Sequence, residues 1–155
     1  MKNVNIYLVA FALLGVLTFS ACGDDDDSGP TISSQIGTAL EGTWTVSTPD
    51  PGNPDDYYDN MSLVFGTFTE GTGGSLSVSG INDDLISDFG TQYNIAGMPS
   101  SISLFSLTLG GNIGEATVSG DPTAGPLVIT FSNQDGATIG RSTGVGEYTL
   151  TITKQ

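Results

Sequence analysis

The residue types in this chain that could do chemistry are few. Its 155 residues include no histidine, one cysteine and three basic residues against seventeen acidic ones, which gives a net charge of −14. Histidine is the commonest general base and a common metal ligand, so catalysis would have to rely on Asp, Glu, Ser, Thr or Tyr. The acidic balance argues against nucleic acid, which is bound through Lys and Arg. It favours divalent cations and neutral or cationic partners.

A proline-rich loop after the first expected strand brings acidic and aromatic side chains together. Asp55, Asp56 and Asp59 could hold calcium through their carboxylate oxygens. Their spacing does not follow a standard calcium motif, so solvated loop charges are the alternative. Tyr57 and Tyr58 could stack on a sugar or on an aromatic ring of a partner, or fold back onto the edge of the domain.

Paired carboxylates are the remaining catalytic possibility. A carboxylate-based hydrolase needs two acidic groups that face each other about 5 to 9 Å apart. Glu115 and Glu147 lie at or near expected strand starts and could face each other. Nothing in their sequence context demands that arrangement, so we expect no enzyme activity. The acidic residues at 83, 84 and 88 follow Asn82 and are explained by capping of a short helix.

The single cysteine, Cys22, follows an apolar segment near the N-terminus. Lys2 is the only charged residue before it, and the apolar run covers residues 6–17. As a helix this run would span about 18 Å, too short for a hydrocarbon core of about 30 Å. A basic start, a short apolar run and small residues before Cys22 predict a cleaved signal peptide over residues 1–21.

Ser20-Ala21-Cys22 resembles the lipobox of bacterial lipoproteins. The resemblance implies cleavage before Cys22 and lipidation of its sulfur. It also implies that the lipoprotein processing and export machinery recognises the chain. Asp24, Asp25, Asp26 and Asp27 resemble the surface-export signal of Bacteroidota lipoproteins; a solvated charged spacer is the alternative. Residues 22–32 are too polar to pack and are expected to form a disordered tether. The expected location is the outer membrane, lipid-anchored and facing the cell exterior.

One domain, residues 33–155, is expected after the tether. Short β-branched and alternating segments predict strands at 43–48, 61–70, 75–79, 92–96, 101–109, 115–119, 127–132 and 146–154. Apolar residues at helical spacing predict short helical turns near 32–40 and 81–90. The fold class is therefore all-β: an antiparallel barrel or a sandwich of about seven or eight strands, with one or two short helical turns.

Gly42-Thr43-Trp44 opens the first expected strand and resembles the Gly-x-Trp opening of lipocalins and lipocalin-like domains. In that family the Trp closes one end of an up-and-down barrel, and a basic residue near the last strand packs over its ring. The resemblance assigns that part to Lys154 or to Arg141. It also implies a site inside the barrel, lined by side chains such as Leu63, Phe65, Leu104 and Leu150. For the segment 101–109 the residues leave two inward sets open: Ile102 and Leu104, or Phe105, Leu107 and Leu109.

Two functions remain open at this point. One is a surface lipoprotein whose non-catalytic domain binds a small ligand or glycan. The other is an accessory subunit of a surface complex that has no small-molecule ligand. The volume of any cavity inside the domain distinguishes these two functions. A filled core favours the accessory subunit.

Replacement of the Cys22 sulfur, to which the lipid is expected to be attached, tests the expected location. Cys22→Ser should move the protein from the membrane fraction to the soluble fraction, because a hydroxyl cannot carry the thioether-linked lipid. The measurement is fractionation of cells followed by immunoblotting. Retention of the Cys22→Ser protein in the membrane fraction would contradict a lipid anchor.

Overall fold

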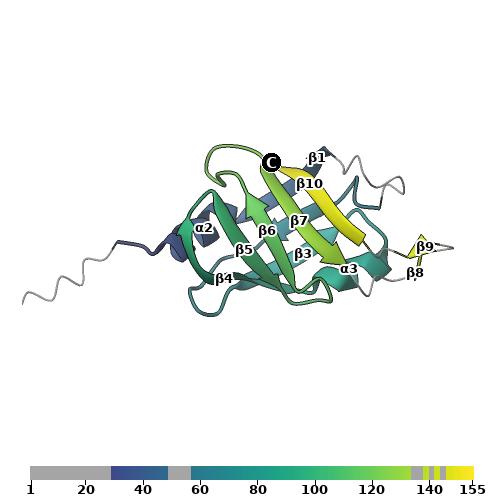
Figure 1. Cartoon of the computed structure of the whole chain (residues 1–155), viewed down its shortest axis with the longest axis horizontal. Coiled ribbons are helices and arrows are strands. Elements are labelled where there is room, and N and C mark those ends of the chain that lie inside the picture. The colour runs from purple at the N-terminus through teal and green to yellow at the C-terminus, as the bar shows by residue number, and fades with distance from the viewer. Residues whose placement is uncertain (1–28, 49–56, 134–137, 140–141, 144–145) are drawn as a thin grey trace, which may run out of the picture.

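The computed structural model describes residues 29–48, 57–133, 138–139, 142–143 and 146–155 (Figure 1). Its helices are α2 (Ile32–Leu40) and α3 (Asp83–Phe89). Its strands are β1 (Gly42–Thr48), β2 (Ser62–Phe65), β3 (Gly74–Ser79), β4 (Gln92–Ser101), β5 (Leu104–Leu109), β6 (Glu115–Ser119), β7 (Leu127–Asn133), β8 (Thr138–Ile139), β9 (Ser142–Thr143) and β10 (Gly146–Lys154). Cys22 and the aspartates at 24–27 lie outside the described residues.

Eight of these strands form a closed antiparallel barrel in the order β1-β10-β7-β6-β5-β4-β3-β2. The first strand pairs with the last, from Trp44 beside Lys154 to Thr48 beside Thr151. Alternation of apolar and polar residues explains the closure, since each strand turns one face inward. In β10, Tyr148, Leu150 and Ile152 are buried. The expectation of an all-β barrel is confirmed, and the sandwich alternative is wrong.

Consecutive barrel strands run in opposite directions, so their connections alternate between two ends of the barrel (Figure 1). We call these the α2 end and the α3 end. The α2 end carries α2, the connections 66–73, 102–103 and 120–126, and the C-terminal residue. The α3 end carries α3, the segment 57–61 and the connection 110–114. Gly29, the first described residue, precedes α2 and so belongs to the α2 end.

Helix α2 closes its end of the barrel. The Thr31 side chain caps the helix by accepting from the Ser34 backbone N–H at 3.1 Å, and Ile36 and Leu40 are buried. Trp44 is fully buried, and its indole Nε1 donates to the Leu40 carbonyl at 2.7 Å. Lys154 Nζ lies 5.6 Å from the Trp44 ring centroid and donates to the Ala39 carbonyl at 2.8 Å. The expected contact between Lys154 and Trp44 is confirmed, whereas Arg141 lies outside the described residues.

Helix α3 covers the other end. Asn82 caps it as expected, with its side chain accepting from the Asp84 N–H at 2.9 Å. Leu85 and Phe89 turn into the core. The helix ends at Gly90, whose φ of +70° suits glycine, and a Cβ there would lie 2.5 Å from the Gly110 carbonyl carbon. The close approach to Gly110 holds the helix against the connection between β5 and β6.

The hairpin of β4 and β5 differs from the sequence expectation, which had separate strands at 92–96 and 101–109. The structure ends β4 at Ser101 and starts β5 at Leu104. Ser101 Oγ makes the turn by accepting from the Ser103 N–H at 3.1 Å. Because β5 begins at Leu104, alternate residues from Phe105 onward face inward. Of the two inward sets that the sequence left open, the one with Phe105, Leu107 and Leu109 is confirmed, because these three side chains are buried. Leu104 is 59% exposed, so its expected place in the barrel interior is wrong.

A matched pair of leucines tests this register. Leu107 is buried at 1% exposure, so Leu107→Ala should cost about 2–5 kcal/mol of unfolding free energy. Leu104→Ala should change it by less than about 0.5 kcal/mol, because the side chain is already in solvent. Urea unfolding of both variants measures the difference. Equal losses at the two positions would contradict the register.

Candidate functional site

The interior of the barrel is filled by side chains. In the described part of the chain, eight apolar residues surround a void of about 10 Å³: Met61, Leu63, Phe65, Leu76, Phe89, Leu109, Ile129 and Phe131. Such a volume is at the lower limit for one water molecule, whereas small-molecule sites measure about 300–1,000 Å³. Leu63, Phe65 and Leu150 are buried as expected. They serve as core here, and this void has no room for a ligand.

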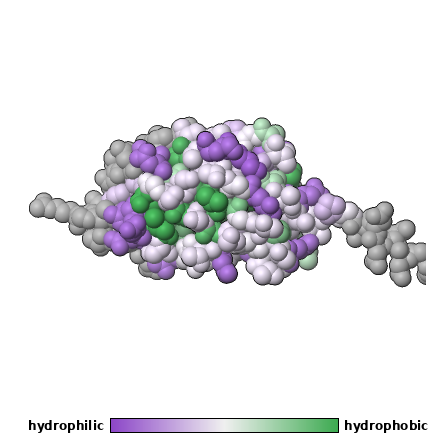
Figure 2. All heavy atoms as spheres, turned by 180° about the vertical axis from the view of Figure 1, so that it is seen from behind, coloured by the Kyte–Doolittle hydropathy of each residue, from purple (hydrophilic) through white to green (hydrophobic). Residues whose placement is uncertain are grey.

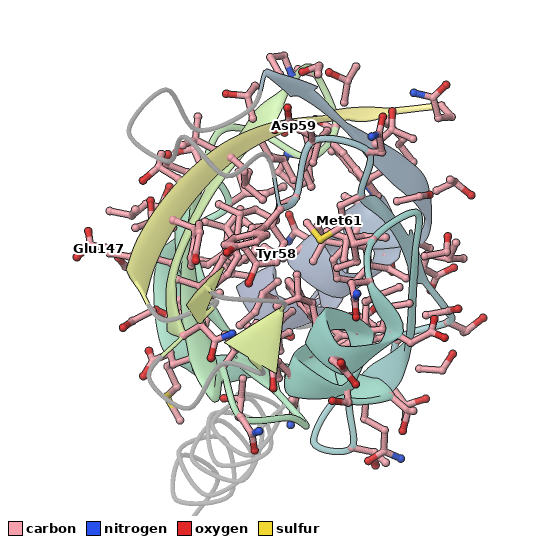
Figure 3. All side chains as sticks on the ribbon, turned by 90° about the vertical axis from the view of Figure 1, so that its right-hand side faces the viewer. Tyr58, Asp59, Met61 and Glu147 are labelled. Atoms are coloured by element: carbon pink, nitrogen blue, oxygen red, sulfur yellow. The ribbon has the colours of Figure 1, made fainter. Side chains whose placement is uncertain are left out.

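Tyr58 lies inside the barrel mouth at the α3 end, not on an exposed loop. It is 2% exposed, and its ring makes edge contacts with Phe89, Phe131 and Tyr148 at centroid distances of 6.0, 5.4 and 4.6 Å. Tyr57 is part-buried against the same core. The alternative that both rings fold back onto the domain is therefore confirmed. Figure 3 looks onto this end and shows Tyr58 and Met61 pointing into the barrel.

A buried polar cluster lies beside these rings. Asp88 of α3 is 2% exposed, and Asn133, the last residue of β7, is fully buried. Asp88 Oδ2 accepts from Asn133 Nδ2 at 2.8 Å, and Oδ1 accepts from Asn112 Nδ2 at 3.1 Å. The backbone carbonyl of Asp88 also accepts from the Ile113 N–H at 3.0 Å. The two bonds to the carboxylate and the one to the backbone carbonyl hold α3 to β7 and to the connection between β5 and β6.

Sequence reasoning missed this cluster because it treated Asp88 as part of the exposed acidic cap. The helical spacing could have revealed the burial of Asp88. Asp88 lies three residues after Leu85 and one before Phe89, on the helix face that is buried. Its partner Asn133 is 45 positions away, and sequence alone does not show that pairing.

Three buried side-chain oxygens at this end have no hydrogen-bond partner among the described residues: the Tyr57 and Tyr58 hydroxyls and Asn133 Oδ1. Burial raises the pKa of Tyr58 from 10.0 to about 12, and nearby Asn133 offsets part of that rise. The Asn133 side chain is thus close enough to act on the hydroxyl, although the two atoms do not meet hydrogen-bond geometry. Unpaired buried polar atoms cost stability, so this is a weak point of the core.

The α3 end also carries most of the acidic side chains described. Asp59, Asp83, Asp84, Glu115 and Glu147 are exposed or part-exposed there. Of the expected calcium ligands, Asp59 is part-buried at this end, while Asp55 and Asp56 lie outside the described residues. Within the described ranges, no three His, Cys, Asp or Glu side chains gather as metal ligands.

Glu115 and Glu147 do not face each other across a cleft. Glu147 pairs with Ser132, and Glu115 lies level with Ser132 from the other side, because Ala116 pairs with Phe131. The backbones of these two exposed residues are therefore two strand spacings apart on the outer wall, about 10 Å. Figure 3 shows Glu147 projecting outward.

An apolar patch marks the wall of the barrel opposite β6. Figure 2 shows apolar side chains gathered on this face, in the half toward the α3 end. Val64 of β2 is 40% exposed. Ile81, just after β3, and Ile86 of α3 are part-exposed, and α3 contacts β3. We call Val64, Ile81 and Ile86 the β2–α3 patch. Asp83 and Asp84, in the first turn of α3, supply acidic groups beside it.

Comparison with models of known protein families gave no match, and a search of curated proteins also found no match. Neither helix in the described part of the chain is long and apolar enough to cross a membrane. The candidate site therefore rests on the geometry of the α3 end and the β2–α3 patch.

A pair of tyrosine-to-phenylalanine variants tests whether the Tyr58 hydroxyl lacks a hydrogen-bond partner. Tyr58→Phe removes a hydroxyl without a partner, so stability at pH 7 should stay the same or rise by up to about 1 kcal/mol. Tyr93→Phe is the control: its hydroxyl donates to the Gly66 carbonyl at 3.0 Å, and loss of that bond should cost about 1 kcal/mol. Urea unfolding of both variants makes the comparison.

The same variants have an expected pH dependence. Burial also raises the pKa of Tyr93 to about 12, with Glu41 adding to the rise. A raised pKa stabilises the folded protein below the unfolded value of about 10, and the gain is lost as the pH rises toward 12. Each Phe variant should therefore lose less stability between pH 9 and pH 11 than the parent protein. An unchanged slope in Tyr58→Phe would contradict the burial of that hydroxyl.

Proposed function

We propose that this chain is a lipid-anchored, non-catalytic accessory domain of a bacterial outer membrane that binds a partner protein on its outer wall. The observation that carries the proposal is the filled barrel, whose described side chains leave a void of about 10 Å³. A barrel that stores a small ligand needs a cavity many times larger. A filled core leaves the outside of the domain as its working surface.

The location rests on the N-terminal sequence, where an apolar run and Ser20-Ala21-Cys22 precede four aspartates. Lipidation of Cys22 would fix the domain to the membrane, and the aspartates would direct it to the cell exterior. The contact between Trp44 and Lys154 supports the proposed likeness to lipocalin-like domains, which use such a pair to close the barrel. In that comparison Trp44 is structural and does not contact a ligand.

The β2–α3 patch is the proposed docking surface. It combines the exposed Val64 with Ile81 and Ile86, which are part-exposed and also pack against the core. The acidic neighbours are Asp83 and Asp84. Protein interfaces have an apolar centre and a polar rim, and complementary charge steers association. The matching partner surface would present apolar side chains bordered by Lys or Arg. The strong excess of acid over base in the whole chain supports a basic partner.

A small polar ligand at the α3 end is the second candidate. The unpaired Tyr58 hydroxyl and Asn133 Oδ1 favour it, because a ligand hydroxyl or amine could satisfy both atoms. Both side chains are almost completely buried, so entry of a ligand would require α3 or the neighbouring aromatic rings to move.

Site-specific crosslinking in native membranes tests the proposal. A photo-reactive residue at Val64 should give one adduct of defined mass with a partner protein. The same residue at Thr108, exposed on β5 three strands away around the barrel, should give none. Mass spectrometry of the protein purified from the same membranes should find no small molecule in stoichiometric amount. A retained small molecule together with no adduct at Val64 would overturn the accessory function and favour the second candidate.

A further inference from the structure

Exposed apolar side chains are concentrated at the α2 end. Four large hydrophobic residues are exposed in the described part of the chain, and three of them belong to this end. Ile32, the first residue of α2, is 36% exposed; Leu104, the first residue of β5, is 59% exposed; Met98 is fully exposed. Single exposed apolar residues are ordinary, but three at one end of a small barrel require an explanation.

Met98 is held out from the barrel by an insertion in β4. Ala96 pairs with Ser106 and Ser101 pairs with Leu104, so residues 97–100 of β4 lie opposite Phe105 alone. Gly97 starts the insertion with a φ of +65°, and no atom lies within 4 Å of the place where its Cβ would be. The insertion thus lifts a flexible apolar side chain off the wall, next to Leu104, with which it lines one shallow hollow.

Charge is distributed in the opposite way. The described acidic residues of the α2 end are Glu41, Glu70 and Asp121, and Lys154 opposes them there. The α3 end has five exposed or part-exposed carboxylates and no described basic residue. A membrane surface with negative charge would therefore repel the α3 end more strongly than the α2 end. The exposed apolar groups therefore favour the α2 end as the end that contacts a membrane, and the carboxylates described at the α3 end disfavour the opposite orientation on anionic lipid.

The chain that leads to the proposed anchor leaves from this same end. Gly29 is seven residues after Cys22, so even fully extended the intervening chain reaches only about 25 Å. A lipid on Cys22 would keep the α2 end within that distance of the bilayer at all times. Such a tether raises the local concentration of the surface at the membrane, so weak contacts become populated.

We propose that the α2 end is a membrane-contacting surface on which Met98 and Leu104 enter the headgroup region of a phospholipid bilayer. This inference rests on the proposed lipid anchor. Shallow insertion of a few apolar side chains strengthens attachment that a lipid chain has begun. Neutral or zwitterionic headgroups suit this surface, because Glu41, Glu70 and Asp121 would oppose anionic ones. The α3 end, with Ile86 and the exposed Asp83 and Asp84, would then face away from the lipid.

Depth-dependent quenching tests the proposal on the full lipidated protein. Cys22 is the only cysteine, and its lipidated sulfur cannot react, so an added cysteine takes a single fluorescent label. The test variant is Met98→Cys, and the control is Ser132→Cys, an exposed residue near the α3 end of β7. Both proteins are reconstituted into phosphatidylcholine vesicles that contain a spin-labelled phosphatidylcholine as the quencher.

The label at position 98 should be quenched at least about threefold more strongly than the label at 132, because only the former reaches the lipid. Addition of anionic phosphatidylglycerol should weaken the quenching at 98. Equal, weak quenching at both positions would overturn the proposal. So would a label at 98 that is shielded from a soluble quencher but not quenched by lipid, since a second copy of the protein would then cover this surface.

Failure of the anchor is distinguishable from failure of the contact. If the protein does not float with the vesicles at all, lipidation of Cys22 and the proposed function fail, and the membrane contact fails with them. If it floats but the label at 98 is not quenched, the anchor stands and the contact alone is overturned. If the contact forms, adding Leu104→Ser to the labelled Met98→Cys protein should make the lipid quenching at position 98 weaker than in Met98→Cys alone. The reason is that Leu104 inserts beside position 98.

Discussion

The pairing of β1 with β10 is the constraint on which the rest of this structure depends. It joins the first strand of the domain to the last and closes the sheet. A closed barrel of eight strands has an interior just wide enough for side chains to fill. The described inward residues fill it almost completely here, so the interior stabilises the fold and has no room for a ligand. Closure also creates two distinct ends, each covered by one helix.

The two ends are stabilised by different chemistry. The α2 end is held by Trp44, whose indole donates to the carbonyl of Leu40 while Lys154 lies over its ring. The α3 end is held by an aromatic cluster and by a buried carboxylate that accepts from two amides. The first arrangement is fully hydrogen-bonded. In the second, the Tyr57 and Tyr58 hydroxyls and Asn133 Oδ1 have no hydrogen-bond partner in the described part of the chain, so fewer of the buried polar atoms of the α3 end are satisfied.

The sequence predicted the fold best where local pattern and burial agree. In β10, threonines alternate with Tyr148, Leu150 and Ile152. This two-residue repeat alone was enough to predict the strand and its inward face. The N-terminal cap of α3 at Asn82 and its end at Gly90 also depend on local sequence, so both could be predicted. The register of β5 could not be predicted, because the turn at Ser101 is made by a serine side chain inside what looked like one long apolar strand. The candidate site was harder still: Tyr58 sits in a polar segment, and only tertiary packing buries it.

The closed sheet has a further consequence if the proposed anchor holds this protein on a membrane surface. Anchoring confines molecules to two dimensions, where neighbours collide far more often than they would in free solution. Open sheet edges would then invite strand-to-strand stacking into aggregates. A barrel without such edges, on a chain with a net charge of −14, can be crowded at high density and still keep its neighbours apart.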